Sequence, residues 1–330
     1  MQTVALARHA MATRFEIVLH GENEVALRAA AEEALDEIER LDSQLSLYRS
    51  DSEISRINAR AAAESVRVEP TLFRLLQCAQ RLSCETAGAF DITVAPLMRC
   101  WGFMRGSGQM PDPKELADAR SRVGMQHVVL NEEDFTVRFA REGMMLDLGS
   151  IGKGFALERA AELLREAGVH SGILHGGTST VYALGSPPGA ANWKVAVPHP
   201  ATASQQPLTA IERSPSPDAL LAVISLKDEA MSVSAVWGKA FEANGRVYGH
   251  VIDPRKGEPV DGAVMAAVVL PSATETDALS TALLTLGLDG HDQIARLRSG
   301  IRTLVASARE RPGEFHVAAK GIEWKCAAVD

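Results

Sequence analysis

The sequence lacks any apolar run of the roughly 18 residues that a membrane-spanning helix requires. Its first residues also lack the basic leader and apolar stretch of a secretory signal, so we expect no signal peptide. The four cysteines, Cys78, Cys84, Cys100 and Cys326, form no Cys-X-X-Cys pair or Cys/His metal pattern, which predicts reduced, mostly buried thiols. These absences predict a cytoplasmic protein, or a periplasmic one if a leader has been removed.

Basic residues are outnumbered: 34 Lys and Arg stand against 42 Asp and Glu, which gives a formal net charge of −8. This sign excludes a protein whose main task is to coat nucleic acid or an anionic membrane. Hydrophobic residues make up 46% of the chain, which excludes disorder and suffices for one large core or two modest ones. The HExxH motif of zinc proteases and the GxSxG elbow of serine hydrolases are both absent.

The apolar patterns predict helices and strands mixed along the whole chain, which is a mixed α/β (α+β) fold class. Helical spacing predicts helices over residues 22–45, 70–86, 155–167 and 275–286. Alternation predicts strands over residues 13–19, 127–130, 136–139, 144–148, 172–175, 193–197, 221–226, 247–252, 264–270 and 303–306. The four tryptophans are scattered and predict core anchors rather than a stacking platform, Trp101 with Phe103 among them.

A glycine-rich segment, residues 147–154, follows a predicted strand and enters a predicted helix. Backbone N–H groups and the dipole at a helix N-terminus attract phosphate, and Lys153 adds a positive charge. The segment is not a P-loop, because Lys153 is followed by Gly154. A plain turn explains the glycines equally well, so both interpretations stay open here. For the second glycine pair, Gly176-Gly177, a tight connection between strands is the favoured interpretation.

His250 stands near the end of a predicted strand, ahead of a turn that Asp253-Pro254 opens and Gly257 closes. A histidine in such a place can act as a general base near neutral pH. In an extended strand His250 and Asp253 point to opposite faces, so they are not automatically partners. A histidine that only braces the turn is the alternative, and the residues alone favour it.

Asp277 and Thr281 lie four residues apart in a predicted helix, so both side-chain oxygens share one helical face. Magnesium and calcium prefer oxygen ligands, and such a pair can help to hold either ion. Backbone carbonyls or substrate phosphates must then supply the other ligands. An aspartate in the first turn of a helix also interacts with the helix dipole, and capping is the favoured interpretation of the isolated pair.

Together and in this order, the motifs resemble the ApbE family of FAD:protein FMN transferases, also called flavin transferases. The resemblance extends from about residue 11 to residue 287. The blocks that carry it are residues 11–13, 45–48, 52–58, 88–97, 101–103, 146–154, 176–177, 250–254 and 276–281. It implies sheets flanked by helices around a cleft for the dinucleotide, in a single domain, or two subdomains, over residues 8–310. Residues 311–330 would form a C-terminal extension.

The resemblance implies that FAD is the substrate and that a divalent cation, usually Mg²⁺, is the cofactor. Members of the family transfer the FMN half of FAD to a Thr or Ser hydroxyl of a target protein and release AMP. The implied partner is therefore an acceptor protein carrying that residue, with no nucleic acid and no membrane span. The oligomeric state cannot be inferred from the sequence.

The resemblance also assigns roles to individual residues. His250 matches the histidine that takes the proton from the incoming hydroxyl. Asp277 and Thr281 match the metal-binding pair, which a backbone carbonyl of residues 147–153, that of Ser150, would complete. The residues implied to contact the FAD, the first two of them at the flavin ring, are Met11, Tyr48, Asp147, Lys153, Ser234 and Thr276.

The sequence departs from the family pattern at two places. Many members carry an acidic residue after the double glycine, where this chain has Thr178, and the family's Thr-Ser-Gly appears here as Val233-Ser234-Ala235. Two alternatives to the transferase accompany the resemblance. The chain could hydrolyse FAD to FMN and AMP as a pyrophosphatase, or it could bind FAD without turnover.

Overall fold

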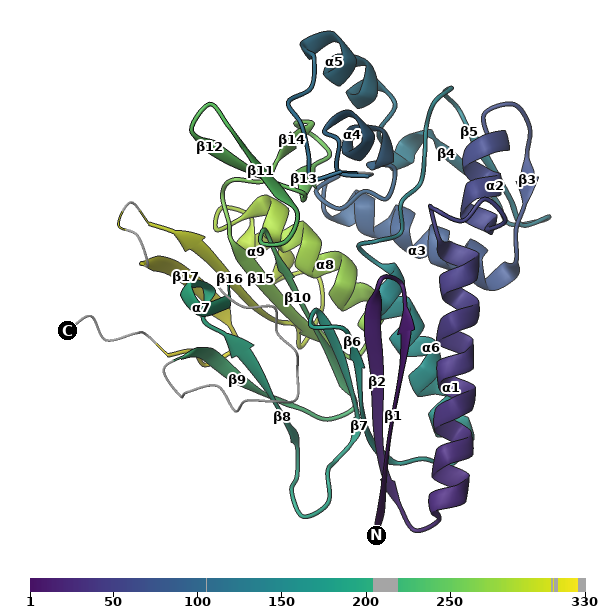
Figure 1. Ribbon diagram of the computed structural model, residues 1–330, viewed down its shortest axis with the longest axis vertical. Helices are drawn as coiled ribbons and strands as arrows, with labels where there is room; N and C mark the ends of the chain where they lie inside the picture. Colours follow the sequence, from purple (N-terminus) through teal and green to yellow (C-terminus); the bar gives the residue numbers. More distant parts are fainter. Residues whose placement is uncertain (105, 204–218, 310, 312–313, 326–330) are drawn as a thin grey trace.

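An eight-stranded antiparallel sheet forms the centre of the computed structural model, which describes residues 1–104, 106–203, 219–309, 311 and 314–325 (Figure 1). Every pair of neighbouring strands in it runs antiparallel. In spatial order the strands are β1 (Gln2–Ala10), β2 (Thr13–Gly21), β6 (Ser171–Gly176), β7 (Thr180–Gly185), β10 (Glu229–Ala235), β15 (Met265–Leu270), β16 (Arg302–Ala308) and β17 (Phe315–Lys320).

Helices and short sheets surround the large sheet. The helices are α1 (Glu24–Leu45), α2 (Glu53–Arg60), α3 (Pro70–Glu85), α4 (Ala95–Cys100), α5 (Pro113–Ser121), α6 (Gly152–Glu166), α7 (Pro200–Ala203), α8 (Ala273–Leu286) and α9 (His291–Ile294). The short sheets contain β3 (Val66–Arg67), β4 (Val128–Asn131) and β5 (Thr136–Phe139), then the pairs β8 (Trp193–Pro198) with β9 (Leu220–Leu226), β11 (Ala240–Ala243) with β12 (Arg246–Gly249), and β13 (Ile252–Asp253) with β14 (Glu258–Pro259).

Strand β15 shows why the sheet is covered on both faces. All its residues are buried, and the side chains of a strand point alternately to opposite faces. Ala266 and Val268 belong to the larger hydrophobic core, whereas Ala267 and Val269 belong to a second core under β8 and β9. A strand buried on both faces reads as a continuous apolar run, as residues 264–270 do.

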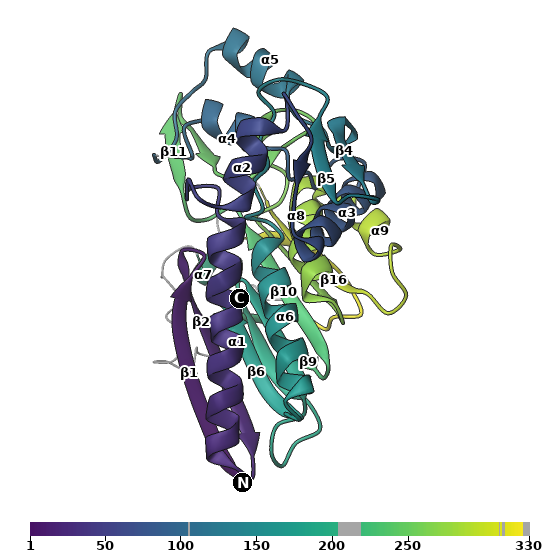
Figure 2. The same ribbon diagram turned by 90° about the vertical axis from the view of Figure 1, so that its right-hand side faces the viewer.

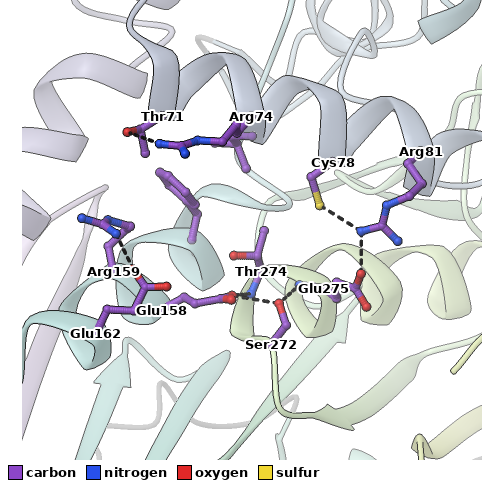
Figure 3. Close-up of a pocket in the computed structure, with 12 residues that line it drawn as sticks. Thr71, Arg74, Cys78, Arg81, Glu158, Arg159, Glu162, Ser272, Thr274 and Glu275 are labelled. Atoms are coloured by element: carbon purple, nitrogen blue, oxygen red, sulfur yellow. Dashed lines mark hydrogen bonds and ion pairs between the residues drawn. The ribbon is translucent and has the colours of Figure 1, made fainter. Parts of the chain in front are cut away.

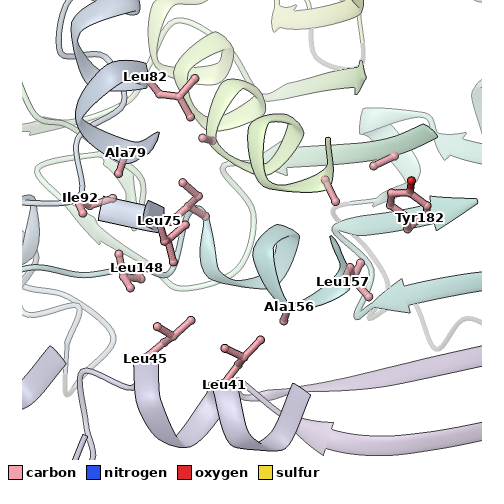
Figure 4. Packing of buried hydrophobic residues seen from close by; sticks show 14 of the residues in the cluster. Leu41, Leu45, Leu75, Ala79, Leu82, Ile92, Leu148, Ala156, Leu157 and Tyr182 are labelled. Carbon is pink, nitrogen blue, oxygen red and sulfur yellow. The ribbon is translucent and has the colours of Figure 1, made fainter. Parts of the chain in front are cut away.

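The larger core lies between the sheet and helices α1, α3, α6 and α8. Leu41 of α1, Leu75 of α3 and Leu157 of α6 converge on it, and Tyr182 of β7 borders it (Figure 4). Helix α1 runs along the β1–β2 hairpin, because its apolar stripe faces that hairpin (Figure 2). Helices α2 to α5 and the short sheets other than the β8–β9 pair gather at one end of the molecule (Figures 1 and 2).

The predicted mixed α/β class is confirmed, because helices and strands alternate along the chain. The predicted helices over residues 22–45, 70–86 and 275–286 correspond to α1, α3 and α8. The helix predicted from residue 155 begins three residues earlier, at Gly152. The sequence analysis missed mostly short elements or strands without clean alternation: β1, α2, β3, α4, α5, β7, α7, β10, β11, β14, α9 and β17.

Two predicted strands are wrong. Residues 144–148 pair with no strand, because the side chain of Asn58 takes both backbone groups of Leu146. The strand predicted over residues 247–252 is two strands, β12 and β13, which are separated by a bend at His250.

The C-terminal part of the described chain joins the large sheet, because β17 pairs along β16 from Thr303↔Lys320 to Ala308↔Phe315. The division into residues 8–310 and an extension of residues 311–330 stays a prediction.

Within the described residues, we found no helix of the length and apolarity that spanning a bilayer requires.

Three cysteines are described, and all three are free thiols. Cys84 is exposed, whereas Cys78 and Cys100 are half-buried. The prediction of mostly buried thiols is therefore wrong for these three, and Cys326 lies outside the described residues.

Helices α6 and α8 cross at Gly154, and the crossing requires glycine there. A Cβ atom at this position would lie 2.1 Å from the carbonyl oxygen of Ala273 and 2.8 Å from the Cβ atom of Asp277. The glycine also brings its own N–H within 2.9 Å of Asp277 Oδ2, to which it donates a hydrogen bond. The structure thus gives Gly154 of the glycine-rich segment a packing role.

We predict that Gly154→Ala lowers the free energy of unfolding by about 2–3 kcal/mol, because a backbone carbonyl blocks the added methyl group. Gly152→Ala is the matched control, since the nearest atom to its added Cβ would be 3.9 Å away. That variant should stay within about 1 kcal/mol of the parent, on the stabilising side. Urea denaturation of the three proteins measures both values, and equal effects at the two positions would contradict the crossing argument.

Candidate active site

A row of hydroxyl groups joins β10 to α8. Ser232 Oγ lies 2.9 Å from Thr276 Oγ1, and Ser234 Oγ lies 2.8 Å from Ser280 Oγ and 3.1 Å from Thr281 Oγ1. Ser232, Thr276 and Ser280 are fully buried, whereas Ser234 and Thr281 are half-buried. Two residues of the strand therefore meet successive turns of the helix, and the predicted residues Ser234, Thr276 and Thr281 share this row.

Asp277 connects the hydroxyl row to the glycine-rich segment. Its side chain is buried, and Oδ2 accepts the hydrogen bond from Gly154 N–H. Thr281 Oγ1 donates to the backbone carbonyl of Asp277 at 3.3 Å. Asp277 thus has an acceptor atom, Oδ1, that receives no hydrogen bond from the described residues. A carboxylate oxygen beside a threonine hydroxyl is a hard oxygen donor set, which fits Mg²⁺.

The metal set is incomplete from side chains alone. Within the described ranges, no group of three or more His, Cys, Asp or Glu residues is placed to hold an ion. Ser150 lies half-buried in the turn before α6, four residues ahead of Gly154. Further ligands must therefore be backbone carbonyls, water or the phosphates of a substrate, as is usual for Mg²⁺.

The segment before α6 is held by Asn58 of α2. Asn58 Nδ2 donates to the Leu146 carbonyl at 3.0 Å, and its Oδ1 accepts from Leu146 N–H at 2.7 Å. Asp147 N–H in turn donates to the Ile92 carbonyl at 2.7 Å. These bonds replace a strand ladder, and they fix the backbone from which the Asp147 side chain projects.

Asp147 and Lys153 stand on either side of the turn. Asp147 Oδ1 accepts from Gly149 N–H at 2.8 Å, and Lys153 Nζ donates to the Gly149 carbonyl at 3.2 Å. Burial raises the pKa of Asp147, although the Gly149 hydrogen bond and the Lys153 charge oppose the rise. Desolvation and the charge of Asp147 raise the pKa of Tyr48, whose side chain is 68% exposed. Tyr48 therefore lies within electrostatic reach of Asp147.

His250 occupies the bend between β12 and β13, where its imidazole is half-buried and Nδ1 has no hydrogen-bond partner in the described structure. Burial lowers the pKa of His250, and a hydrogen bond with the Lys239 backbone opposes this change. The ammonium groups of Lys239 and Lys153 lower the pKa further. Gly238, at φ +134°, faces the ring: a Cβ there would lie 3.2 Å from Cε1. Asp253 is paired with Arg255 at 2.7 Å, so it is not the partner of His250.

Met11 lies in the turn between β1 and β2. Met11 and Ala12 have φ values of +49° and +58°, the left-handed conformation of the type I′ turns that suit two-residue hairpins. The Met11 side chain packs against the larger core. The β6–β7 turn is adjacent, since Gly177 N–H donates to the Arg14 carbonyl at 3.0 Å, and Thr178 is exposed at its tip.

The ApbE family model matches residues 11–305 of the chain. The chain belongs to the ApbE family. An FAD:protein FMN transferase of Haemophilus influenzae is 29% identical over 304 residues, which cover 89% of this chain and 84% of that protein. One of Vibrio cholerae is 30% identical over 259 residues, which cover 76% of this chain and 71% of that protein.

Solved structures of the ApbE family share the fold. The apo form of the flavinyl transferase ApbE of Pseudomonas stutzeri has a TM-score of 0.81 at 27% identity, covering 97% of this chain and 95% of that one. The ApbE protein of Thermotoga maritima has a TM-score of 0.79 at 26% identity, covering 92% and 94%.

The structure links most of the residues that the ApbE resemblance singles out. Lys153 lies within electrostatic reach of both Asp147 and His250, and Asp147 within reach of Tyr48. The next residue, Gly154, bonds to Asp277, whose helix carries the hydroxyl row. Met11 and Ser150 have no contact with this set among those seen in the described residues, so their roles stay predictions.

A cavity of about 430 Å³ lies elsewhere, between α3, α6 and α8 (Figure 3). Its charged groups are largely paired: Arg81 with Glu275 and Arg159 with Glu162, whereas Glu158 accepts hydrogen bonds from Ser272 Oγ and Thr274 N–H. None of the predicted site residues lines it. The cavity is therefore separate from the site that the ApbE resemblance predicts.

Sequence reasoning missed Asn58, Gly238 and Ser232, although each shapes the site. Asn58 lies in a quoted family block, but its partner is 88 residues away along the chain, so no local pattern reveals the contact. Ser232 could have been predicted from Ser234, because residues two positions apart in a strand point to the same face.

We predict that Asn58→Ala destabilises the protein by about 2–3 kcal/mol, because the buried N–H and C=O groups of Leu146 lose their partners. Amide hydrogen exchange at Leu146 and Asp147 should accelerate more than at α1. Asn58→Asp keeps the acceptor and loses the donor, so its destabilisation should be smaller. Unchanged exchange at Leu146 in Asn58→Ala would show that another group holds the segment.

Proposed function

We propose that this chain is an FAD:protein FMN transferase, which moves the FMN half of FAD to a Thr or Ser hydroxyl of an acceptor protein and releases AMP. Family membership and the curated relatives support a transferase that uses FAD. The structural observation that carries the proposal is the 2.9 Å hydrogen bond from Gly154 N–H to Asp277, which joins the segment of Asp147 and Lys153 to the helix that carries the hydroxyl row. Positive charge and oriented polar groups at one place are what transfer from a diphosphate requires.

The proposed reaction is one displacement at phosphorus. A bond forms between the acceptor oxygen and the FMN phosphorus, and the bond from that phosphorus to the bridging oxygen breaks. AMP leaves with the electron pair of that bond, and the hydroxyl proton passes to a ring nitrogen of neutral His250. We propose that the charge of Lys153 offsets the negative charge of the phosphates.

We propose that Asp277 and Thr281 hold Mg²⁺, together with the backbone carbonyl of Ser150. Mg²⁺ supplies charge neutralisation at the diphosphate when it is bound. Asp277 Oδ1, the hydroxyl row and the absence of soft ligands support this choice of ion. Asp277 also stays fixed by Gly154 N–H, so its carboxylate is oriented before an ion arrives.

Acceptor labelling tests the function. We expect a purified candidate acceptor, incubated with this protein, FAD and Mg²⁺, to gain the mass of FMN on a Thr or Ser residue. Steady AMP release without any acceptor would instead identify an FAD pyrophosphatase, with water as the nucleophile. Tight FAD binding without AMP under either condition would identify a binding protein and overturn the proposal.

We predict that His250→Ala lowers the transfer rate about 10²–10⁴-fold, the usual contribution of a general base, while FAD still binds. Because burial lowers the pKa of His250, its neutral form predominates at pH 7. The rate of the parent protein should therefore fall only as the pH drops through that lowered pKa, below the usual 6.5. His9→Ala, an exposed histidine on β1, is the control and should leave the rate unchanged.

We predict that Mg²⁺ raises the melting temperature of the FAD-bound parent protein but not that of Asp277→Asn. Asparagine keeps an oxygen for Gly154 N–H and loses the charge that an ion needs. Asp289→Asn, an exposed change beyond the end of α8, is the control and should respond like the parent. An equal Mg²⁺ response in Asp277→Asn would show that Asp277 only connects α6 and α8 and does not bind the ion.

A further inference from the structure

His250 does not belong to the large sheet. It follows directly after β12, and the β11–β12 hairpin pairs with no other strand in the described part of the chain. Backbone hydrogen bonds of a larger sheet therefore cannot set the position of the histidine. A two-stranded hairpin is marginally stable by itself, so side-chain packing must hold it.

Aromatic rings supply that packing on one face of the hairpin. Phe241 and Tyr248 are directly opposite each other in the register, and their rings stack with centroids 5.3 Å apart. Trp101 lies 5.6 Å from Tyr248 and 6.3 Å from Phe241, and Phe103 lies 5.9 Å from Phe241. We call these four residues the ring cluster. Aromatic pairs in these arrangements stabilise a fold beyond the area that they bury.

The chain on the far side of His250 is tied to the same cluster. Ile252 of β13 is buried in the core that contains Trp101. Trp101 Nε1 also donates a buried hydrogen bond of 2.8 Å to the Gly257 carbonyl, in the turn after β13. The chain is therefore held by packing on both sides of His250, at Tyr248 two residues before it and at Ile252 two residues after it.

The cluster also reaches the segment in front of the hairpin. Lys239 Nζ donates to the Phe103 carbonyl at 3.5 Å, and Gly238 faces the imidazole directly. Gly108 is required where it stands, since a Cβ there would lie 2.3 Å from the Phe241 ring. The packing thus fixes both His250 and the residues that face its ring, Gly238 and Lys239.

We propose that Phe241 and Tyr248 are positioning residues, which hold the imidazole of His250 in place by packing on Trp101 and Phe103. The inference rests on the proposed function only for its rate measurement. A displacement of about 1 Å at a reacting group can lower a rate about 10²-fold. Replacing a ring of the cluster should therefore slow transfer while every residue that the resemblance assigns to FAD stays in place.

The environment of the imidazole gives a second readout. The charged groups that act on His250 are Lys239, before β11, and Lys153 of α6. A looser hairpin admits water to the ring, and hydration favours the charged imidazolium. The pKa of His250 should then move up toward its ordinary value, which a change in FAD binding alone would not cause.

The experiment compares Phe241→Ala with Glu242→Ala and Val247→Ala. The two controls form the neighbouring cross-strand pair on the opposite, exposed face of the same hairpin. We expect kcat of Phe241→Ala to fall about 10–100-fold with an unchanged KM for FAD, and the acid limb of its pH profile to move upward. Both controls should match the parent, and Phe241→Tyr, which restores a ring, should recover most of the rate.

NMR titration of the His250 imidazole separates this inference from the proposed function. If the parent protein shows no transfer, the function fails, and the titration still tests the positioning. If Phe241→Ala melts like the parent and shows the parent rate and the parent His250 pKa, the inference is wrong. Phe241→Leu serves as the second variant if Phe241→Ala does not fold, and it is expected to lie between Phe241→Ala and the parent.

Discussion

The contact between Gly154 and Asp277 is the constraint on which the site depends. Without a side chain at residue 154, α6 can approach α8 until a backbone N–H reaches the buried carboxylate. One end of this contact continues into the turn that holds Asp147 and Lys153, and the other into the hydroxyl row on β10. A single close approach of two helices thus aligns a cation, a carboxylate and several hydroxyls that lie far apart in the sequence.

The sequence predicted the elements whose signals are local. Helices α1 and α3 have apolar stripes, α8 has a serine cap and a final glycine that mark its ends, and β15 is a continuous apolar run. Residues 144–148 are equally apolar, yet they form no strand because Asn58, 88 residues away, occupies their backbone. The break at His250 is also set from a distance, because Tyr248 before it and Ile252 after it both pack in the core around Trp101. Long-range side-chain contacts decide such cases, and local periodicity does not record them.

The site residues could be predicted from the sequence mainly through the resemblance to the ApbE family. Asp277 and Thr281 share a helical face at a spacing that the sequence shows, but the residues alone favour capping over metal binding. The link from Lys153 to His250 joins residues 97 positions apart on different elements, and nothing in either motif predicts it. At Gly154 the motif suggested a phosphate-binding turn, whereas the structure shows that the glycine lets two helices pack closely.

The order of strands in the large sheet has a consequence for the nascent chain. Strands β1 and β2 pair at once, but the next neighbour of β2 is β6, and Leu19 meets Gly172. At roughly 5–20 residues per second, a ribosome needs on the order of ten seconds to make the residues between them. During that interval β6 is not there to pair with the second edge of β2, and α1 is the first helix that can pack on Phe15, Ile17 and Leu19. The position of α1 directly after β2 in the chain thus makes it the earliest helix available to cover this hydrophobic face.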